Sequence, residues 1–366
     1  MDMRDITLCI TESCNLSCTY CYENHKSKKQ MSFNTAKNII DYEMSIKDQF
    51  AGVLFNLFGG EAFLNFGLIE QIVSYLETNY YNSRLKWHCF VTTNGTLIHD
   101  EIQEYLRAHK CSISCGLSLD GPKKWHDINR FNSFDNIDLD FFANVYPDQN
   151  VKMTISPDTL PHLSECVIFA HNKKFNVACN LAYGIDWSNL TNVSILEREL
   201  ENLITFYLNH PDIKPCSMLN DNIYKIAFKN DVANRECGSG QHMRAYDVDG
   251  VSYACQFFMP ISIGEEKAIE SRSIKWHGDT IPLDKLDNRC KECVLKSCCH
   301  ICYGSNFAST GNIYLHDDNW CKLNKLIFKA RAYFRIKQFE LGQLMGTEIE
   351  QKATLQSALI ILDSLN

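Results

Sequence analysis

Short runs of β-branched and aromatic residues alternate with stretches of apolar residues at helical spacing in the first half of the chain. This alternation is typical of a parallel sheet with crossover helices. Six βα steps are too few for a closed eight-stranded barrel, so we expect a partial (β/α)6 TIM-like barrel with its active site at the carboxyl ends of the strands. The predicted strands are Ile6–Thr11, Val53–Phe58, Trp87–Thr93, Ser112–Leu119, Val151–Ile155 and Val177–Ala182, and the predicted helices lie near 32–47, 67–80, 98–109, 136–146 and 162–174.

The second half of the chain lacks this alternation. A helix is predicted over Leu196–Leu208, followed by a connector with Pro211 and Pro215. From Cys237 to Cys321 the sequence is rich in Gly, Cys and turn residues, so we expect its fold to depend on bound metal. The predicted organisation is a barrel domain at 1–185, a helical linker at 186–234, a cysteine-rich domain at 235–325 and C-terminal helices at 326–366.

Charge and composition narrow the class of protein. The chain has 366 residues and a formal net charge of -8, which argues against a broad nucleic-acid footprint. It has no apolar run long enough to span a membrane and no signal peptide, so a cytoplasmic protein without a membrane partner is expected. In that reducing compartment its 18 cysteines point to metal binding or catalysis rather than to disulfides.

Three of these cysteines, Cys14, Cys18 and Cys21, lie within eight residues directly after the first predicted strand. Three thiolates can hold an iron–sulfur cubane and leave one iron open to a substrate or cofactor. The alternative is zinc, which needs a fourth ligand; the nearest candidates are Cys9 and His25.

The Cys-x3-Cys-x2-Cys spacing, with Tyr20 before the last cysteine, resembles the signature of radical S-adenosylmethionine (SAM) enzymes. Further motifs of that family follow in order at predicted strand ends, with Ala62 after the Gly-Gly-Glu motif where the family usually has Pro. The resemblance implies that one cluster electron splits SAM and that a 5′-deoxyadenosyl radical removes a hydrogen atom from the substrate. It implies that Glu61 holds the SAM ammonium group, Ser118 the ribose and Arg130 the carboxylate. The residues implied to bind this cofactor are Tyr20, Gly59, Gly60, Glu61, Asn94, Ser118, Asp120 and Arg130.

The second cysteine field resembles the SPASM extension of radical SAM peptide-modifying enzymes, which holds two auxiliary 4Fe-4S clusters. The resemblance implies one cluster on Cys237, Cys255 and Cys302, and another on Cys290, Cys293, Cys321 and either Cys298 or Cys299, of which we prefer Cys299. The first of these clusters lacks an obvious fourth cysteine, because Met243 stands where sulfatase maturases have one. Either Cys298 fills the gap or one iron is open, and an open iron could bind a substrate group. A zinc ribbon is the alternative reading of this field. The other seven cysteines are expected to be core thiols: Cys9, Cys89, Cys111, Cys115, Cys166, Cys179 and Cys216.

The resemblance implies an oxidoreductase that modifies a ribosomally made precursor peptide by a thioether or carbon–carbon crosslink, with an electron donor such as flavodoxin or ferredoxin. The first alternative is an anaerobic sulfatase maturase. Those enzymes carry an Asp base where this chain has Gln256, and an amide cannot act as a base. Asp249 is expected to form the turn before Gly250, so no catalytic base is identified. The second alternative is a metal-stabilised scaffold without turnover.

Overall fold

The structure is a computed structural model that describes residues 3–47, 49–228, 233–234, 237–277, 280–282 and 284–365. The domain boundary predicted at residue 235 lies outside these residues. The whole four-part division stays a prediction. In the described part of the chain, no helix is long and apolar enough to cross a membrane.

The larger sheet has the strand order β4-β3-β2-β1-β8-β9. Its first four strands are parallel and agree with the predicted ones to within a few residues, since buried apolar runs make them. β8 also runs parallel to β1, and β9 returns antiparallel to β8. The strands are β1 (Met3–Thr11), β2 (Gly52–Gly59), β3 (Lys86–Thr93), β4 (Ile113–Leu117), β8 (Met243–Tyr246) and β9 (Ser252–Tyr253).

The other two predicted strands, β5 (Asn150–Ile155) and β6 (Asn176–Leu181), pair with each other in a separate parallel sheet. This sheet meets the larger one at a parallel bridge between Ser118 and Lys152. The six predicted strands therefore form two parallel sheets in contact, rather than one continuous barrel sheet. A short antiparallel pair, β7 (Ala233–Asn234) and β10 (Thr280–Ile281), lies elsewhere.

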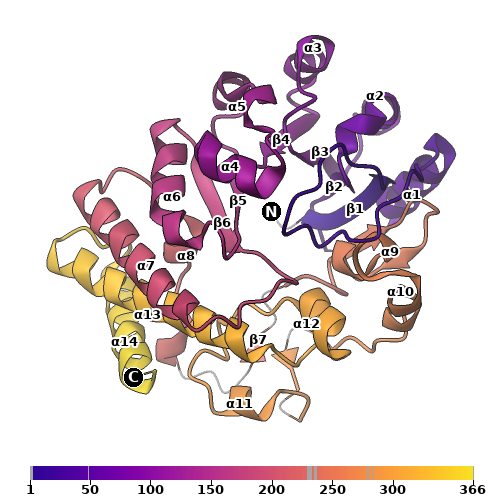
Figure 1. Ribbon diagram of the computed structural model, residues 1–366. Coiled ribbons are helices and arrows are strands. Elements are labelled where there is room, and N and C mark those ends of the chain that lie inside the picture. The colour runs from indigo at the N-terminus through magenta and orange to yellow at the C-terminus, as the bar shows by residue number, and fades with distance from the viewer. Residues whose placement is uncertain are drawn as a thin grey trace.

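Helices connect successive strands and pack on the outer side of the two sheets (Figure 1). They bury an apolar stripe that includes Ile40 and Ile72 against a core that includes Leu8 and Phe55. The helices of this half are α1 (Phe33–Ser45), α2 (Phe66–Tyr80), α3 (Asp100–Ala108), α4 (Lys123–Arg130), α5 (Leu139–Val145) and α6 (Leu163–Asn172).

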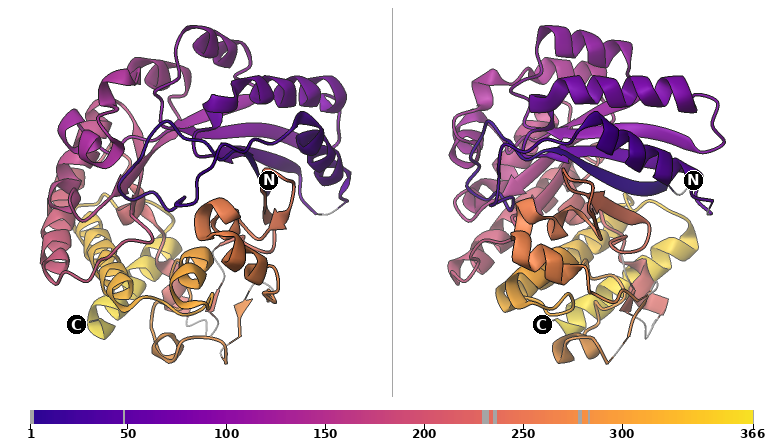
Figure 2. Two further views of the ribbon diagram at one scale, coloured as in Figure 1. Left: turned by 45° about the vertical axis from the view of Figure 1, so that its right-hand side comes forward. Right: turned by 90° about the vertical axis from the view of Figure 1, so that its right-hand side faces the viewer.

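The second half of the chain lies across the open side of the arch formed by the two sheets and their helices (Figure 2). α7, α13 and α14 pack together at one end, and the short helices α9 to α12 carry the cysteine-rich segment. The bounds are α7 (Thr191–Asn209), α8 (Ser217–Asn220), α9 (Pro260–Ile263), α10 (Glu265–Ser271), α11 (Asn288–Lys291), α12 (Tyr303–Thr310), α13 (Asp318–Glu340) and α14 (Glu348–Ser364).

A buried ion-pair network ties β8 to the first sheet. Glu43 of α1 is fully buried and pairs with Arg4 of β1 and, at 2.8 Å, with Arg244 of β8. The hydroxyl of Tyr246 donates to the same carboxylate. These contacts join the cysteine-rich segment to the edge of β1, an interaction that the sequence pattern did not reveal.

Asp249 lies in the turn between β8 and β9, directly before Gly250, as predicted. The side chain that holds this turn is that of Asp247: its carboxylate accepts hydrogen bonds from the backbone of Asp249 at 3.0 Å and of Val251 at 2.8 Å. Asp249 has a side chain that is 70% exposed and lies 3.6 Å from Lys29. Gly250 has a φ of +84°, which suits a residue without a side chain.

Candidate active site

The three clustered cysteines lie on a closed loop, residues 12–30, that leaves the end of β1 and returns to it. Thr11 and Gln30 form an antiparallel bridge, and the backbone N–H of Glu12 donates to Lys29 at 3.0 Å. Cys14, Cys18 and Cys21 are each half-buried on this loop. Burial raises the pKa of Cys14 to about 11, so its thiol is protonated until a metal binds, because coordination deprotonates a thiol.

The turn after β2 packs directly against this loop. A Cβ on Gly60 would lie 2.5 Å from the Ser13 carbonyl oxygen and 2.8 Å from the Cys14 Cβ, so only glycine fits there. The N–H of Glu61 donates to the same Ser13 carbonyl at 2.9 Å. The Gly-Gly-Glu turn therefore sets the position of the first cysteine.

The Glu61 side chain connects the β2 turn to the turn after β3. Its carboxylate is 2% exposed and accepts hydrogen bonds from the Thr93 hydroxyl at 2.8 Å, the Asn94 N–H at 2.8 Å and the Phe63 N–H at 3.2 Å. Burial raises its pKa, and these hydrogen bonds act against that shift. A carboxylate has about four acceptor positions, so about one is left for a ligand ammonium group.

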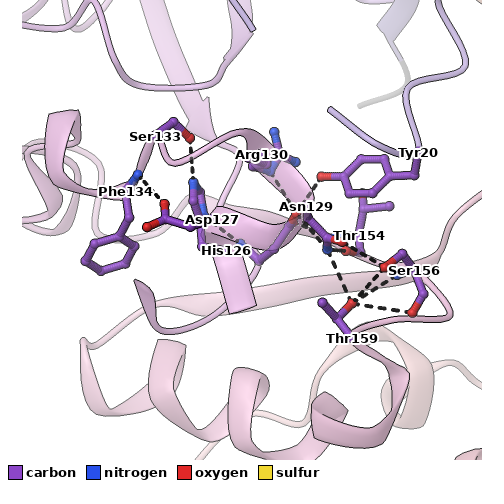
Figure 3. Close-up of polar contacts among 11 residues, drawn as sticks. Tyr20, His126, Asp127, Asn129, Arg130, Ser133, Phe134, Thr154, Ser156 and Thr159 are labelled. Carbon is purple, nitrogen blue, oxygen red and sulfur yellow. Dashed lines mark hydrogen bonds and ion pairs between the residues drawn. The ribbon is translucent and has the colours of Figure 1, made fainter. Parts of the chain in front are cut away.

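Asp120 is the centre of a buried polar network; its partners Tyr20, Asn129, Arg130 and Thr154 are labelled in Figure 3. Its carboxylate is fully buried and accepts hydrogen bonds from Arg130 Nε at 2.9 Å, the Tyr20 hydroxyl at 2.5 Å and the Thr154 N–H at 2.9 Å. Asn129 donates to the same carboxylate at 3.3 Å. With no exposed surface, Asp120 is placed to hold Arg130 rather than to touch a cofactor.

Arg130 is held by an ion pair between its Nε and the Asp120 carboxylate. Its guanidinium also lies over the Tyr20 ring, 5.4 Å from the ring centre. Among the described residues, no hydrogen bond reaches its two terminal nitrogens. The Ser118 hydroxyl also lacks a partner within the described part of the chain, although its N–H donates to Thr93 at 2.8 Å. Both groups can therefore serve an anionic or hydroxyl-bearing ligand.

His126, also in this network, has a structural role. Its Nδ1 accepts from the Asp120 N–H at 3.3 Å and its Nε2 faces the Ser133 hydroxyl at 3.0 Å. Burial lowers its pKa to about 4, so the ring is neutral at physiological pH.

Four of the later cysteines line a single cavity. Cys290, Cys293, Cys299 and Cys321 surround it together with Trp320 and Asn324. The Asn324 amide donates to Cys299 Sγ at 3.3 Å. Cys298 does not line this cavity: it is 5% exposed in an apolar cluster with Phe328 and Ile361, against which Cys293 and Cys299 also pack.

Cys237, Cys255 and Cys302 form the other group. Burial raises the pKa of the Cys302 thiol to about 12, and the nearby thiols of Cys255 and Cys237 contribute to this rise. Met243 is on β8 and lines a different, surface pocket with Arg244 and Ser252. Of the seven predicted core thiols, six are buried and Cys111 is exposed, contrary to the prediction.

A cavity of about 410 Å³ lies between the cysteine loop and the second cysteine field. One wall is aromatic: Tyr22 stacks on Phe257 with ring centres 4.1 Å apart, and Tyr183 lies 4.7 Å from Trp320. Cys302 also lines this cavity. The lining also includes the polar residues Asn24, His25, Lys267, Ser305 and Asp317.

Two charged residues of the loop escaped the sequence reasoning. Lys26 Nζ lies 3.0 Å from Cys21 Sγ. Glu23 is 7% exposed, and burial raises its pKa to about 8. No periodicity or motif marks either residue, because both positions depend on how the loop closes.

No group of three or more His, Cys, Asp or Glu side chains, among the residues described, converges closely enough to hold a single metal ion. A 4Fe-4S cluster binds each thiolate at a different iron, so its ligands are spaced more widely than those of one ion. The loop with three half-buried thiols, packed on glycine, fits such a cluster.

Residues 8–137 match the sequence model of the radical SAM superfamily. This chain carries a radical SAM domain. Enzymes of this superfamily use SAM and a 4Fe-4S cluster. An uncharacterized protein of Methanocaldococcus jannaschii is 34% identical over 45% of this chain, and the match spans 57% of that relative. The radical SAM cyclopropyl synthase TigE of Paramaledivibacter caminithermalis is 22% identical over 89% of this chain and 73% of its own length.

Solved structures share the α/β radical SAM fold. The structure of anSMEcpe with bound AdoMet has a TM-score of 0.71 at 18% identity, covering 97% of this chain and 99% of that one. Streptococcus suis SuiB bound to precursor peptide SuiA has a TM-score of 0.55 at 16% identity, covering 87% of this chain and 75% of SuiB. At these identities the likeness concerns the fold alone.

Proposed function

We propose that this radical SAM enzyme is a peptide maturase that removes a hydrogen atom from a ribosomally made precursor peptide and forms a thioether or carbon–carbon crosslink. The cavity of about 410 Å³ carries this proposal. Tyr22, the neighbour of Cys21, lines one side of it, and Cys302 lines another. A substrate in this cavity therefore lies between the proposed SAM-binding cluster and the proposed auxiliary cluster.

The relatives support a peptide substrate. SuiB, which has the same fold, was solved with its precursor peptide. TigE, which is similar over most of this chain, is named as a cyclopropyl synthase. These names describe SuiB and TigE, so the peptide and the bond made by this chain are proposals.

The proposed cofactors, rather than protein side chains, would supply the reactive group: when bound, the reduced cluster and SAM would provide a carbon radical that takes a hydrogen atom from the substrate. Cys14, Cys18 and Cys21 would hold this cluster and leave one iron for SAM. The terminal nitrogens of Arg130 would pair with the SAM carboxylate, a task that suits a guanidinium. Glu61, with about one acceptor position free, would take its ammonium group.

The remaining predicted residues have supporting roles in this proposal. Asp120 and Tyr20 position Arg130 through the hydrogen bonds described above. Gly59 and Gly60 let the β2 turn approach the cysteine loop, and Asn94 holds the loop through its amide, which donates to Asn15 at 2.9 Å. Ser118 would meet the ribose.

We further propose two auxiliary 4Fe-4S clusters. Cys290, Cys293, Cys299 and Cys321 would hold one, and the support is the cavity that these four side chains share. Cys298 is left out of that set because it packs among apolar residues. Cys237, Cys255 and Cys302 would hold the other. Crosslinking removes two electrons from the peptide, and these clusters would accept the second one before an external carrier such as flavodoxin or ferredoxin.

The walls of the cavity suit a peptide. Its aromatic residues offer an apolar surface to a side chain, and its polar residues offer donors and acceptors to a peptide backbone. The volume lies in the range of ordinary ligand sites, roughly 300–1,000 Å³.

Formylglycine formation is less favoured. Gln256 follows Cys255 at the start of a short helical turn, and its amide cannot take a proton from the substrate. Its side chain is half-buried, so its place in the site is filled by a group without basic chemistry.

The test is co-expression with a peptide encoded beside the gene, followed by mass spectrometry of that peptide and measurement of 5′-deoxyadenosine from SAM. We expect a peptide lighter by two hydrogens for each crosslink and a stoichiometric nucleoside product. A formylglycine product would favour the sulfatase maturase. Absence of 5′-deoxyadenosine from fully reconstituted protein with its peptide would favour the scaffold.

A further inference from the structure

Lys26 is the charged group hydrogen-bonded to a sulfur of the cysteine loop. Its Nζ lies 3.0 Å from Cys21 Sγ, and its charge also acts on Cys14 and Cys18. In the second cysteine field the contact to Cys299 is made by the neutral amide of Asn324, at 3.3 Å. The two proposed cluster sites therefore differ in the charge of the group that contacts a ligand sulfur.

The closure of the loop fixes Lys26 in this position. The Ser13 hydroxyl donates to the Ser27 carbonyl at 3.0 Å, which returns the chain beside the cysteines. The N–H of His25 donates to the Ile261 carbonyl at 3.0 Å, which anchors the same segment to α9. Lys26 is half-buried between these two anchors, whereas Lys28 is exposed on the same loop.

We propose that Lys26 is a positioning residue that raises the reduction potential of the cluster held by Cys14, Cys18 and Cys21. The inference rests on the proposed ligand role of these cysteines, not on the peptide substrate. Hydrogen bonds to ligand sulfurs and nearby charge are among the factors that set iron–sulfur potentials.

The direction follows from electrostatics. Reduction brings one electron from a low-potential donor into the cluster, adds one negative charge and breaks no bond. The ammonium group keeps its proton, and its hydrogen bond to the thiolate strengthens as the sulfur gains charge. Lys26 therefore stabilises the reduced cluster more than the oxidised one, which eases reduction of the cluster by its donor.

The experiment is a potentiometric titration of the reconstituted full chain, followed by electron paramagnetic resonance. The SAM-binding cluster is recognised as the signal that changes when SAM is added, and Cys21→Ala should remove that signal. For Lys26→Met we expect a roughly tenfold lower ratio of reduced to oxidised cluster at a fixed potential, about 59 mV for one electron. Lys26→Arg should stay close to wild type, and Lys26→Gln should fall between.

Lys28→Met is the matched control, since it removes an exposed charge from the same loop, and it should leave the potential unchanged. An unchanged midpoint in both Lys26→Met and Lys26→Gln would overturn the proposal. An equal shift in Lys28→Met would also overturn it, because it would indicate a general charge effect. Loss of the cluster from both neutral variants, with Lys26→Arg retaining it, would assign Lys26 to cluster retention and likewise overturn the tuning role. None of these readouts requires a peptide, so failure of this proposal can be told apart from failure of the proposed peptide-modifying function.

Discussion

The residues at the carboxyl ends of the strands of the larger sheet are of two kinds. Some have polar atoms available to a ligand, and others hold those residues in position. Arg130 and Ser118 keep polar atoms without partners among the described residues, whereas Asp120 has all its contacts within the protein. Both kinds of residue belong to one sequence motif, from Ser118 to Arg130. The motif alone predicts that these residues belong to one site, but burial is needed to tell their roles apart.

Asp120→Asn should weaken SAM binding without abolishing the fold. Asn keeps the shape of the side chain but removes the charge that holds Arg130 Nε at 2.9 Å. We expect roughly a tenfold increase in the SAM dissociation constant, or about 1.4 kcal/mol, visible in kinetics as a higher KM for SAM with a smaller change in kcat. Asp135→Asn is the control, because Asp135 is 70% exposed and its ion pair in the described part of the chain is with surface Lys123. Equal SAM affinity in the two variants would contradict a positioning role for Asp120.

The adjacent pair Cys298 and Cys299 gives a second prediction at this scale. Cys299→Ala should lower the iron content by about four atoms per chain, since a cubane holds four irons. Cys298→Ala should keep the iron and lower stability by about 1 kcal/mol, because it removes one small apolar group from a buried cluster. Iron analysis and thermal unfolding of both variants measure these effects. Loss of iron from Cys298→Ala alone would reverse the proposed assignment.

At the scale of elements, the six strands of the first half could be predicted because each is a short run of buried apolar residues between turn motifs. α4 could not be predicted in the same way: its buried face consists of Trp125, His126, Asn129 and Arg130, so a polar network replaces the apolar stripe. β8 was also missed. Its four residues carry no clear alternation, and its partner β1 lies more than two hundred positions earlier in the sequence.

The pairing of cysteines with clusters has the same limit. Spacing alone does not distinguish Cys298 from Cys299. Each of them fits one of the two gaps that the SPASM spacing predicts between Cys293 and Cys302. Only packing separates them: Cys298 is buried with Leu295 and Phe328, whereas Cys299 lines a cavity together with three other cysteines. The loop that carries Cys14, in contrast, could be predicted from spacing because all three of its cysteines are local.

Gly60→Ala tests how the β2 turn positions the cysteine loop. The new Cβ would lie 2.5 Å from the Ser13 carbonyl oxygen and 2.8 Å from the Cys14 Cβ, so the loop has to move. We expect loss of the SAM-binding cluster, about four irons per chain, and loss of 5′-deoxyadenosine formation. Gly67→Ala, in the exposed first turn of α2 with nothing within 4 Å of the new Cβ, should keep both. Full iron and activity in Gly60→Ala would show that the turn does not constrain the loop.

Across the whole molecule, the cysteine-rich segment is not an independent appendage. β8 extends the first sheet, the Glu43 network fixes it there, and the His25 N–H to Ile261 contact ties the cysteine loop to α9. The cavity between the two halves is therefore bounded by elements that are fixed to each other on both sides. In the proposed function, this arrangement would hold one substrate near two groups of cysteines that are distant in the sequence.

Filling that cavity separates substrate binding from SAM cleavage. Ser309 of α12 is exposed and lines the cavity, so Ser309→Trp would place a large side chain in it while leaving the cysteines and the proposed SAM-binding residues unchanged. We expect slow SAM cleavage without peptide to persist, while the stimulation by peptide and the crosslinked product fall at least tenfold. Glu266→Trp, on the exposed face of α10 outside the cavity lining, is the control and should behave as wild type. The measurement is 5′-deoxyadenosine formation with and without peptide, together with the mass of the peptide. If Ser309→Trp keeps full peptide-dependent turnover, the substrate does not bind in this cavity and the proposed function loses the observation that carries it.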